Sequence, residues 1–148
     1  MQELIDDYCE GMEKGQKFKG YLPGGASGGI LPASLNNIPL DYGSKELADE
    51  GCFLGSAAIV ILSDKDSMKD VGLNLLKFFQ DESCGQCTPC RVGTEKTVKI
   101  MQEKIWNKEK LQDLSEVMSE ASICGLGQAA SNPLRSIIKY FGKELKYE

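Results

Sequence analysis

A chain of 148 residues is long enough for one ordinary domain or two small ones. Its formal net charge of −5, from 17 basic and 22 acidic residues, argues against a surface that binds nucleic acid. The chain contains no histidine, which excludes Ser-His and Cys-His catalytic pairs and every metal or haem site that depends on imidazole.

The first residues predict a helix, a strand and a turn. Apolar side chains recur at helical spacing in residues 1–13, at Leu4, Ile5, Tyr8, Cys9 and Met12. We therefore expect an amphipathic helix whose buried stripe includes Cys9. A strand is predicted for residues 17–21. The glycine-rich segment 22–32 that follows lacks the ending of a phosphate-binding loop, which favours a structural turn.

A continuous apolar run, residues 57–62, is typical of a strand that is buried on both faces. It is much shorter than the roughly 18 apolar residues that a membrane span requires. Cys52, which is isolated from the other cysteines, is expected in the core. Residues 1–64 together predict a small α+β unit with few strands.

Residues 65–148 predict four amphipathic helices with short connections. The first begins after Ser67, the second follows Gly93 and extends toward Ile105, the third begins at Asn107, and the fourth begins with Asn132 as its N-cap and ends near Gly142. The third helix is expected to bury Leu111, Leu114, Val117, Met118 and Ala121. Such helices are typical of an antiparallel bundle, in which the first and third loops lie at the same end.

Those two loops contain four of the six cysteines. Cys84, Cys87 and Cys90 are separated by two residues each, and Cys124 follows in the later loop. Three thiolates at this spacing, completed by one from a distant segment, are typical ligands of a 4Fe–4S cluster. Gly85, Gly93 and Gly125 are expected to let backbone N–H groups approach the cluster sulfurs. Arg91 is interpreted either as a counter-charge to the cluster or as a solvated surface charge.

Two other chemistries remain open from the residues alone. Zinc is the main alternative, although structural zinc sites usually draw their ligands as two pairs, whereas here the division is three and one. Redox-active thiols are the third interpretation, and they require an exposed cysteine with a low pKa. The absence of a visible secretory signal favours a reducing compartment over disulfide bonds.

The cysteine segments have the patterns Ser83-Cys84-Gly85-x-Cys87-x-Pro89-Cys90-Arg91-x-Gly93 and Ser122-x-Cys124-x-Leu126-Gly127. They resemble the iron–sulfur-binding region of the NADH-oxidising flavoprotein subunit of respiratory complex I, and of the diaphorase subunits of NAD-reducing hydrogenases and NAD-dependent formate dehydrogenases. Upstream, Pro23-Gly24-Gly25-Ala26-Ser27 and Gly51-x-x-x-Gly55-Ser56-Ala57 resemble the soluble-ligand-binding β-grasp (SLBB) domain of those subunits.

The resemblance implies that Cys84, Cys87, Cys90 and Cys124 bind a 4Fe–4S cluster that accepts single electrons from FMN reduced by NADH. It implies an FMN- and NADH-binding domain or subunit as donor, and a ferredoxin-like subunit with a 2Fe–2S centre or several clusters as acceptor. It also implies the peripheral arm of a complex, in the cytoplasm or on the matrix side of an organelle, with no membrane insertion and no nucleic acid.

The resemblance also sets the expected domains. Residues 1–64 are expected to be an SLBB-like β-grasp unit, truncated at its N-terminus, and residues 65–148 a four-helix 4Fe–4S-binding domain. The family's larger FMN- and NADH-binding domain has no counterpart in this sequence. Hydride chemistry belongs to the flavin, so the chain alone is not expected to oxidise NADH. The alternative function is a zinc-stapled docking module without a redox role.

Overall fold

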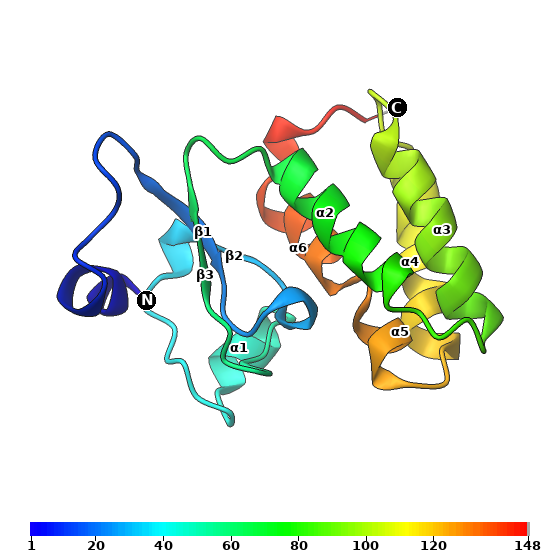
Figure 1. The fold of residues 1–148 in the computed structure, drawn as a ribbon, viewed down its shortest axis with the longest axis horizontal. Coiled ribbons are helices and arrows are strands. Elements are labelled where there is room, and N and C mark those ends of the chain that lie inside the picture. Colours follow the sequence, from blue (N-terminus) through cyan, green and yellow to red (C-terminus); the bar gives the residue numbers. More distant parts are fainter. Residues whose placement is uncertain (148) are drawn as a thin grey trace. The chain divides into compact units, whose positions relative to one another are not determined.

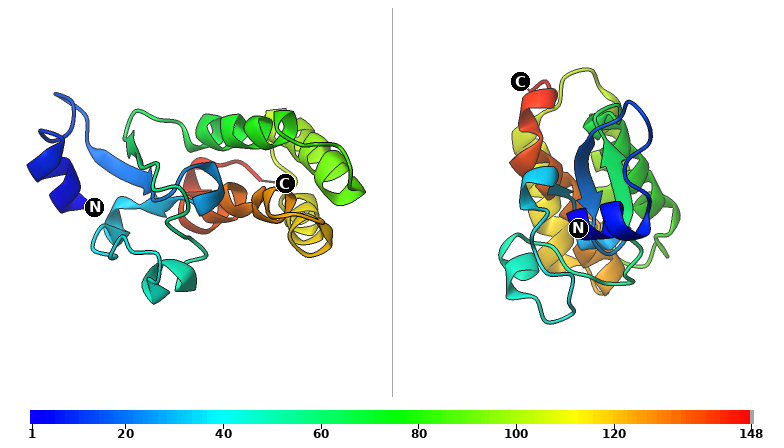
Figure 2. Two further views of the ribbon diagram at one scale, coloured as in Figure 1. Left: turned by 60° about the horizontal axis from the view of Figure 1, so that its bottom comes forward. Right: turned by 90° about the vertical axis from the view of Figure 1, so that its left-hand side faces the viewer.

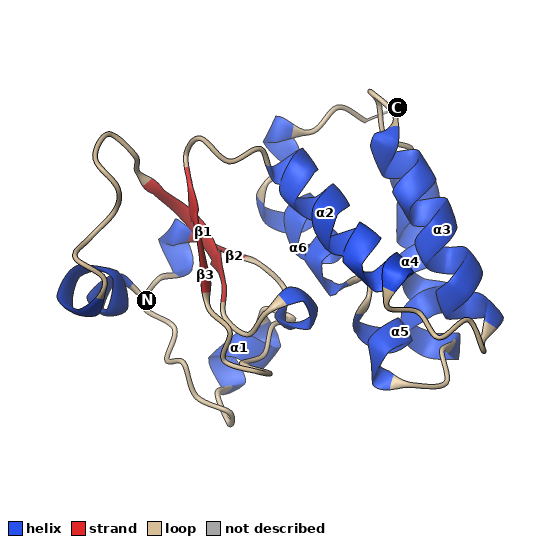
Figure 3. Cartoon of the chain, viewed as in Figure 1, coloured by secondary structure: helices blue, strands red, loops and turns tan. Residues whose placement is uncertain are grey.

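The computed structural model describes residues 1–147, which form two compact units divided in the chain between Ser67 and Met68. The strands lie in the first unit and the long helices in the second (Figure 3). The predicted α+β class, with a small sheet followed in the chain by four main helices, is confirmed. No helix in the described part of the chain has the length and apolar character needed to span a bilayer.

The first unit is built on a three-stranded antiparallel sheet in the order β2-β1-β3. Its strands are β1 (Phe18–Leu22), β2 (Leu31–Pro32) and β3 (Val60–Ser63), and its helical segments are Leu4–Tyr8, Ala26–Gly28, Ala33–Leu35 and α1 (Lys45–Asp49). In the central strand, Tyr21 pairs with Leu31 on one side and with Ile61 on the other. The core of this unit is made of fully buried side chains: Ile5, Tyr21, Ile30, Leu31 and Leu47.

The glycine-rich segment packs backbone against backbone. A Cβ atom on Gly24 would lie 1.9 Å from the carbonyl oxygen of Leu54, and one on Gly28 would lie 2.7 Å from that of Phe53. The Phe53 N–H also donates to the Gly28 carbonyl at 3.2 Å. Close packing thus explains these two glycines without any phosphate ligand.

Two predictions for the first unit are wrong. The N-terminal helical segment ends at Tyr8 instead of near residue 13, and Tyr8 and Cys9, both expected on its buried stripe, are exposed. The apolar run 57–62 is a strand only from Val60, since Ala57 has a φ of +54° that interrupts extended structure. Val60, on the edge strand β3, is 45% exposed rather than buried on both faces. Cys52 lies in the core, as predicted.

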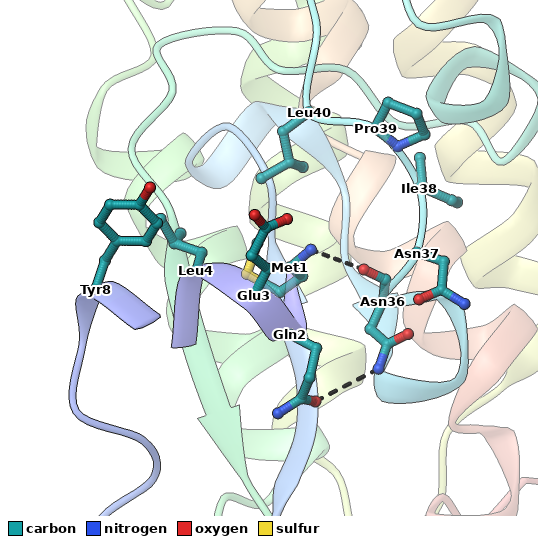
Figure 4. Close-up of a pocket in the computed structure, with 10 residues that line it drawn as sticks. All are labelled: Met1, Gln2, Glu3, Leu4, Tyr8, Asn36, Asn37, Ile38, Pro39 and Leu40. Carbon is teal, nitrogen blue, oxygen red and sulfur yellow. Dashed lines mark hydrogen bonds between the residues drawn. The ribbon is translucent and has the colours of Figure 1, made fainter. Parts of the chain in front are cut away.

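A groove with a volume of about 460 Å³ lies in the first unit, between the N-terminal turn and residues 36–40 (Figure 4). The Met1 amino group donates to the Asn36 carbonyl at 2.7 Å, and the Asn36 side chain donates to Gln2 Oε1 at 3.4 Å. None of the four predicted ligand cysteines lines this groove.

The second unit consists of α2 (Met68–Asp81), α3 (Thr88–Gln102), α4 (Lys108–Ala121), α5 (Gly125–Ala129), α6 (Asn132–Tyr140) and a final helical turn (Gly142–Glu144). The four longer helices alternate in direction along the chain (Figure 1). They pack in the pairs α2–α3, α3–α4, α4–α6 and α2–α6, so they close into a bundle. Its core contains Met68, Leu76, Met101, Trp106, Leu111, Met118, Leu134 and Ile137.

Some details of this unit differ from the predictions. Ile105 lies beyond the end of α3 and is 50% exposed, while Trp106 occupies the core and donates from Nε1 to the Met101 carbonyl at 2.9 Å. On α4, Val117 and Ala121 are exposed, whereas Ser115 is buried. The Ser115 hydroxyl is satisfied within the helix, because its Oγ donates to the Leu111 carbonyl at 2.7 Å. The N-cap of α6 is Ser131, one residue before the expected Asn132.

Candidate metal centre

The first group of cysteines lies where α3 begins. Cys87 is the N-cap residue of this helix, and Pro89 occupies its first turn, where the fixed φ of proline favours a helix. The helix therefore begins at Thr88 and includes Cys90, which was expected in a loop. Cys90 is only 4% exposed, whereas Cys84 lies exposed in the preceding loop.

The loop around Cys84 is folded back onto α3. Gly85 has a φ of +75°, and its N–H donates to Ser83 Oγ at 3.3 Å. The guanidinium of Arg91 donates to the Gly85 carbonyl. Arg91 thus anchors the cysteine loop, a role that neither interpretation of this residue from the sequence included.

Ser83 also contacts the buried thiol. Its Oγ lies 3.3 Å from the Sγ of Cys90, within hydrogen-bonding distance for sulfur. Ser83 belongs to the cysteine motif, but the sequence analysis assigns it no function. Its position next to Cys84 is the one sequence feature that points to the site, and spacing alone does not reveal a contact with a residue seven positions later.

The second cysteine segment lies at the same end of the bundle. Cys124 is exposed and is the N-cap residue of α5. A Cβ on Gly127 would lie 2.5 Å from Ser122 Oγ and 2.9 Å from the Cβ of Cys90, so this glycine lets α5 approach the first turn of α3. In Figures 1 and 2, α5 lies at the same end of the bundle as the loop between α2 and α3.

The electrostatics of Cys87 connect the two segments. The backbone N–H of Ile123, and after it that of Cys90, hold the pKa of the Cys87 thiol below its usual value. The Ser122 hydroxyl contributes a smaller lowering of the same pKa. That hydroxyl is buried and makes no hydrogen bond of ordinary geometry among residues 1–147, so it is available as a donor. A lowered pKa favours the thiolate, which is the form that binds metal.

The three glycines expected to bring an amide near cluster sulfurs have other surroundings, and the Gly85 N–H donates to Ser83 Oγ. A Cβ on Gly93 would lie 2.5 Å from Met118 Cγ, so this glycine serves the packing of α3 against α4. Gly125 has no neighbouring atom within 4 Å of a Cβ position. The amide that most lowers the pKa of Cys87 is instead that of Ile123, which the sequence did not single out.

The donor set fits a cysteine-ligated cluster. All six cysteines lie in the described part of the chain as free thiols, and four of them come from the two segments at one end of the bundle. Within residues 1–147, no three Cys, Asp or Glu side chains are placed to hold one metal ion. Soft sulfur ligands, the lowered pKa of the Cys87 thiol and the glycine contact between the segments match the requirements of an iron–sulfur centre. The assignment of the four ligands stays a prediction.

Known proteins resemble the chain over almost its whole length. It is 35% identical over 150 residues to the NADP-reducing hydrogenase subunit HndC of Solidesulfovibrio fructosivorans, covering 97% of this chain and 30% of that protein. It is 33% identical over 154 residues to the mitochondrial NADH dehydrogenase (ubiquinone) flavoprotein 1 of Dictyostelium discoideum, covering 99% of this chain and 32% of that one. The chain spans about a third of the length of these curated relatives.

A solved structure supports the same relationship. An NAD⁺-reducing [NiFe]-hydrogenase in the air-oxidized state matches with a TM-score of 0.76 and 27% identity, over 98% of this chain and 26% of that chain. The family model described as the NADH-ubiquinone oxidoreductase-F iron-sulfur binding region matches residues 70–148, which include all four predicted ligand cysteines. The chain therefore belongs to the family of NADH-ubiquinone oxidoreductase-F iron–sulfur binding regions.

Proposed function

We propose that this chain is an electron-transfer module that holds one 4Fe–4S cluster through Cys84, Cys87, Cys90 and Cys124. The observation that carries the proposal is the contact between the two cysteine segments, where Gly127, three residues after Cys124, packs so closely on Cys90 that an added Cβ would lie 2.9 Å from the Cβ of Cys90. When bound, a cluster of this kind accepts and releases one electron at a time.

The residues of the chain would bind the cluster and stabilise its charge. Four thiolates supply the ligands, and the start of α3, where Cys87 caps the helix, places the positive end of the helix dipole beside negative charge. Cys90, at 4% exposure, lies where water has little access. Burial and N–H donors of this kind are the features by which proteins set cluster potentials.

The partners follow from the relatives, which are named as a mitochondrial NADH dehydrogenase flavoprotein and as hydrogenases that reduce NADP or NAD⁺. The electron donor in this proposal is FMN reduced by NADH, and it is bound by a different domain or subunit from these 148 residues. The acceptor is a ferredoxin-like subunit. The assembly is a peripheral part of an NAD-linked complex in a reducing compartment, and residues 1–64 are its SLBB-like unit.

An anaerobic assay of iron and acid-labile sulfide tests the cofactor. About four irons and four sulfides per chain, with a spin-half EPR signal after dithionite reduction, are expected. Photoreduced FMN should produce the same signal, since the cluster would take electrons from a flavin. Zinc without sulfide would overturn the proposal and leave a metal-stapled docking module.

Cysteine variants test the ligands. Four single variants each replace one predicted ligand by serine: Cys84→Ser, Cys87→Ser, Cys90→Ser and Cys124→Ser. Each should contain less iron than the wild type, because a cluster that loses one thiolate ligand is held less firmly. Cys9→Ser is the matched control, since Cys9 is also an exposed free thiol but lies in the other unit. Equal iron in all five variants would show that these four cysteines are not the ligands.

A further inference from the structure

We propose that the Ser83 hydroxyl donates a hydrogen bond to the Cys90 sulfur and thereby raises the reduction potential of the bound cluster. This inference rests on the proposed function, because it concerns the cluster that Cys90 would ligate. It assigns Ser83 as a positioning residue that sets the potential without binding iron.

The neighbours of Ser83 determine which way its hydroxyl points. Ser83 Oγ lies 3.3 Å from Cys90 Sγ, and it also accepts the Gly85 N–H at 3.3 Å. The amide occupies a lone pair of the oxygen, so the hydroxyl hydrogen remains for the sulfur. A ligating Cys90 is a thiolate without a hydrogen of its own, so in the loaded protein only Ser83 can be the donor.

The loop holds this arrangement in place. Gly85 adopts a left-handed φ of +75°, a conformation that favours glycine at this turn. The Arg91 guanidinium, one turn into α3, donates to the Gly85 carbonyl. The loop is therefore connected to the same helical turn that bears Cys90, and Ser83 and Cys90 form parts of one hydrogen-bonded structure.

Burial gives the bond its electrostatic effect. Cys90 is 4% exposed, the least exposed of the four predicted ligands, so little water competes for its sulfur. A hydrogen bond is stronger in such surroundings than in water. Reduction adds one negative charge to the cluster and its sulfurs, so a donor to sulfur stabilises the reduced state more than the oxidised state. The midpoint potential rises as a result.

The test compares three variants of the full chain, loaded with cluster under anaerobic conditions. Ser83→Ala removes the hydroxyl, and Ser83→Thr retains it. Ser136→Ala is the matched control, because Ser136 Oγ also makes an internal hydrogen bond, at 2.9 Å to the Asn132 carbonyl, but that bond lies within α6. Each sample is assayed for iron and sulfide and then titrated by EPR at controlled potential.

Ser83→Ala should keep its iron and lower the equilibrium constant for reduction about tenfold, which is about 59 mV for a one-electron couple. Ser83→Thr and Ser136→Ala should retain the wild-type potential. Electron–nuclear double resonance of the reduced cluster should show one exchangeable proton in wild type and Ser83→Thr that is missing from Ser83→Ala. That proton would be the hydroxyl hydrogen itself.

Two outcomes would overturn the inference alone. An unchanged potential in a fully loaded Ser83→Ala would show that the hydroxyl only supports the loop. Loss of iron from Ser83→Ala, with iron retained in Ser83→Thr, would show that the hydroxyl is needed to build the site rather than to set its potential. A wild-type chain that takes up no iron and sulfide would instead refute the proposed function, and this inference with it.

Discussion

Gly127 illustrates how the candidate site depends on single atoms. It lies where α5 approaches the first turn of α3, and a Cβ there would lie 2.5 Å from Ser122 Oγ and 2.9 Å from Cys90 Cβ. We expect Gly127→Ala to lower the free energy of unfolding of the apo chain by about 1–3 kcal/mol, as overpacking usually does. Urea unfolding measures this loss, and the iron content after loading should fall with it.

The control is the other glycine of the same helix. Gly125 has no atom within 4 Å of a Cβ position, so Gly125→Ala brings no clash and gains up to about 1 kcal/mol of helix propensity. If both alanine variants unfolded at the same urea concentration as wild type, the close approach of α5 to Cys90 would not exist in solution.

The burial of Tyr21 predicts that the stability of the first unit depends on pH. Its side chain is fully buried and its hydroxyl donates to the Leu35 carbonyl at 2.9 Å. Burial, with a smaller effect of Cys52, raises the pKa of Tyr21 from 10.0 to about 12. Because the folded pKa lies above the unfolded one, the stabilisation is complete below pH 10 and is lost as the pH rises toward about 12.

Urea unfolding followed by circular dichroism between pH 9 and pH 12 would measure this loss of stability. This range spans the rise in the pKa of Tyr21 from 10.0 to about 12. We expect the decline to be shallower in Tyr21→Phe, which has no phenol to ionise. Tyr42→Phe should retain the wild-type decline, since Tyr42 is 78% exposed. A wild-type slope in Tyr21→Phe would mean that other groups cause the alkaline transition.

At the scale of elements, the sequence predicts the helices that are long enough to show a regular apolar repeat. Apolar spacing was enough for α4, which was expected to begin at Asn107 and begins at Lys108 with Asn107 as its N-cap. Periodicity missed α5, because its five residues are too few to show a helical repeat. It also placed the start of α3 after Cys90, since the cysteines interrupt the apolar pattern although Pro89 favours a helix there.

The cap of α4 carries a prediction of its own. The Asn107 side chain accepts the Lys110 N–H at 2.9 Å and so satisfies one of the free donors of the helix. Asn107→Ala should lower the free energy of unfolding of the second unit by about 1 kcal/mol and leave the cysteines in place. Fluorescence of the adjacent Trp106, the sole tryptophan of the chain, measures the urea midpoint.

Ser44→Ala is the control for that cap. Ser44 caps α1 in the first unit in the same way, accepting the Leu47 N–H at 3.2 Å. Its removal should leave the Trp106 transition unchanged. A shift as large as that of Asn107→Ala would show that Trp106 fluorescence does not report on the second unit alone.

For the candidate site as a whole, sequence predicts where the two cysteine segments lie better than it predicts the contacts around them. Cysteine spacing singled out four thiols, and the expected order of the helices placed both segments at one end of the bundle, where the structure has them. The contacts of Ser83 with Cys90 and of Gly127 with Ser122 depend on how side chains meet across elements. No local sequence pattern encodes such contacts.

At the scale of the whole molecule, the division into two compact units predicts a local effect of the cluster. All four predicted ligands lie in the unit that begins at Met68. A ligand that binds only the folded form stabilises what it binds, and a cluster bound by these four cysteines would couple to the folding of that unit. Anaerobic removal of the cluster should therefore lower the urea midpoint of Trp106 fluorescence.

Hydrogen exchange would show whether the effect stays local. Amides of α2, α3 and α4 should exchange faster in the apo chain, while those of β1 (Phe18–Leu22), which pair with β2 and β3, should keep their protection. Equal loss of protection in β1 and α3 would mean that the two units unfold as one. Unchanged exchange everywhere would mean that the cluster does not bind the helical unit, because a bound ligand must slow the opening of the structure that holds it.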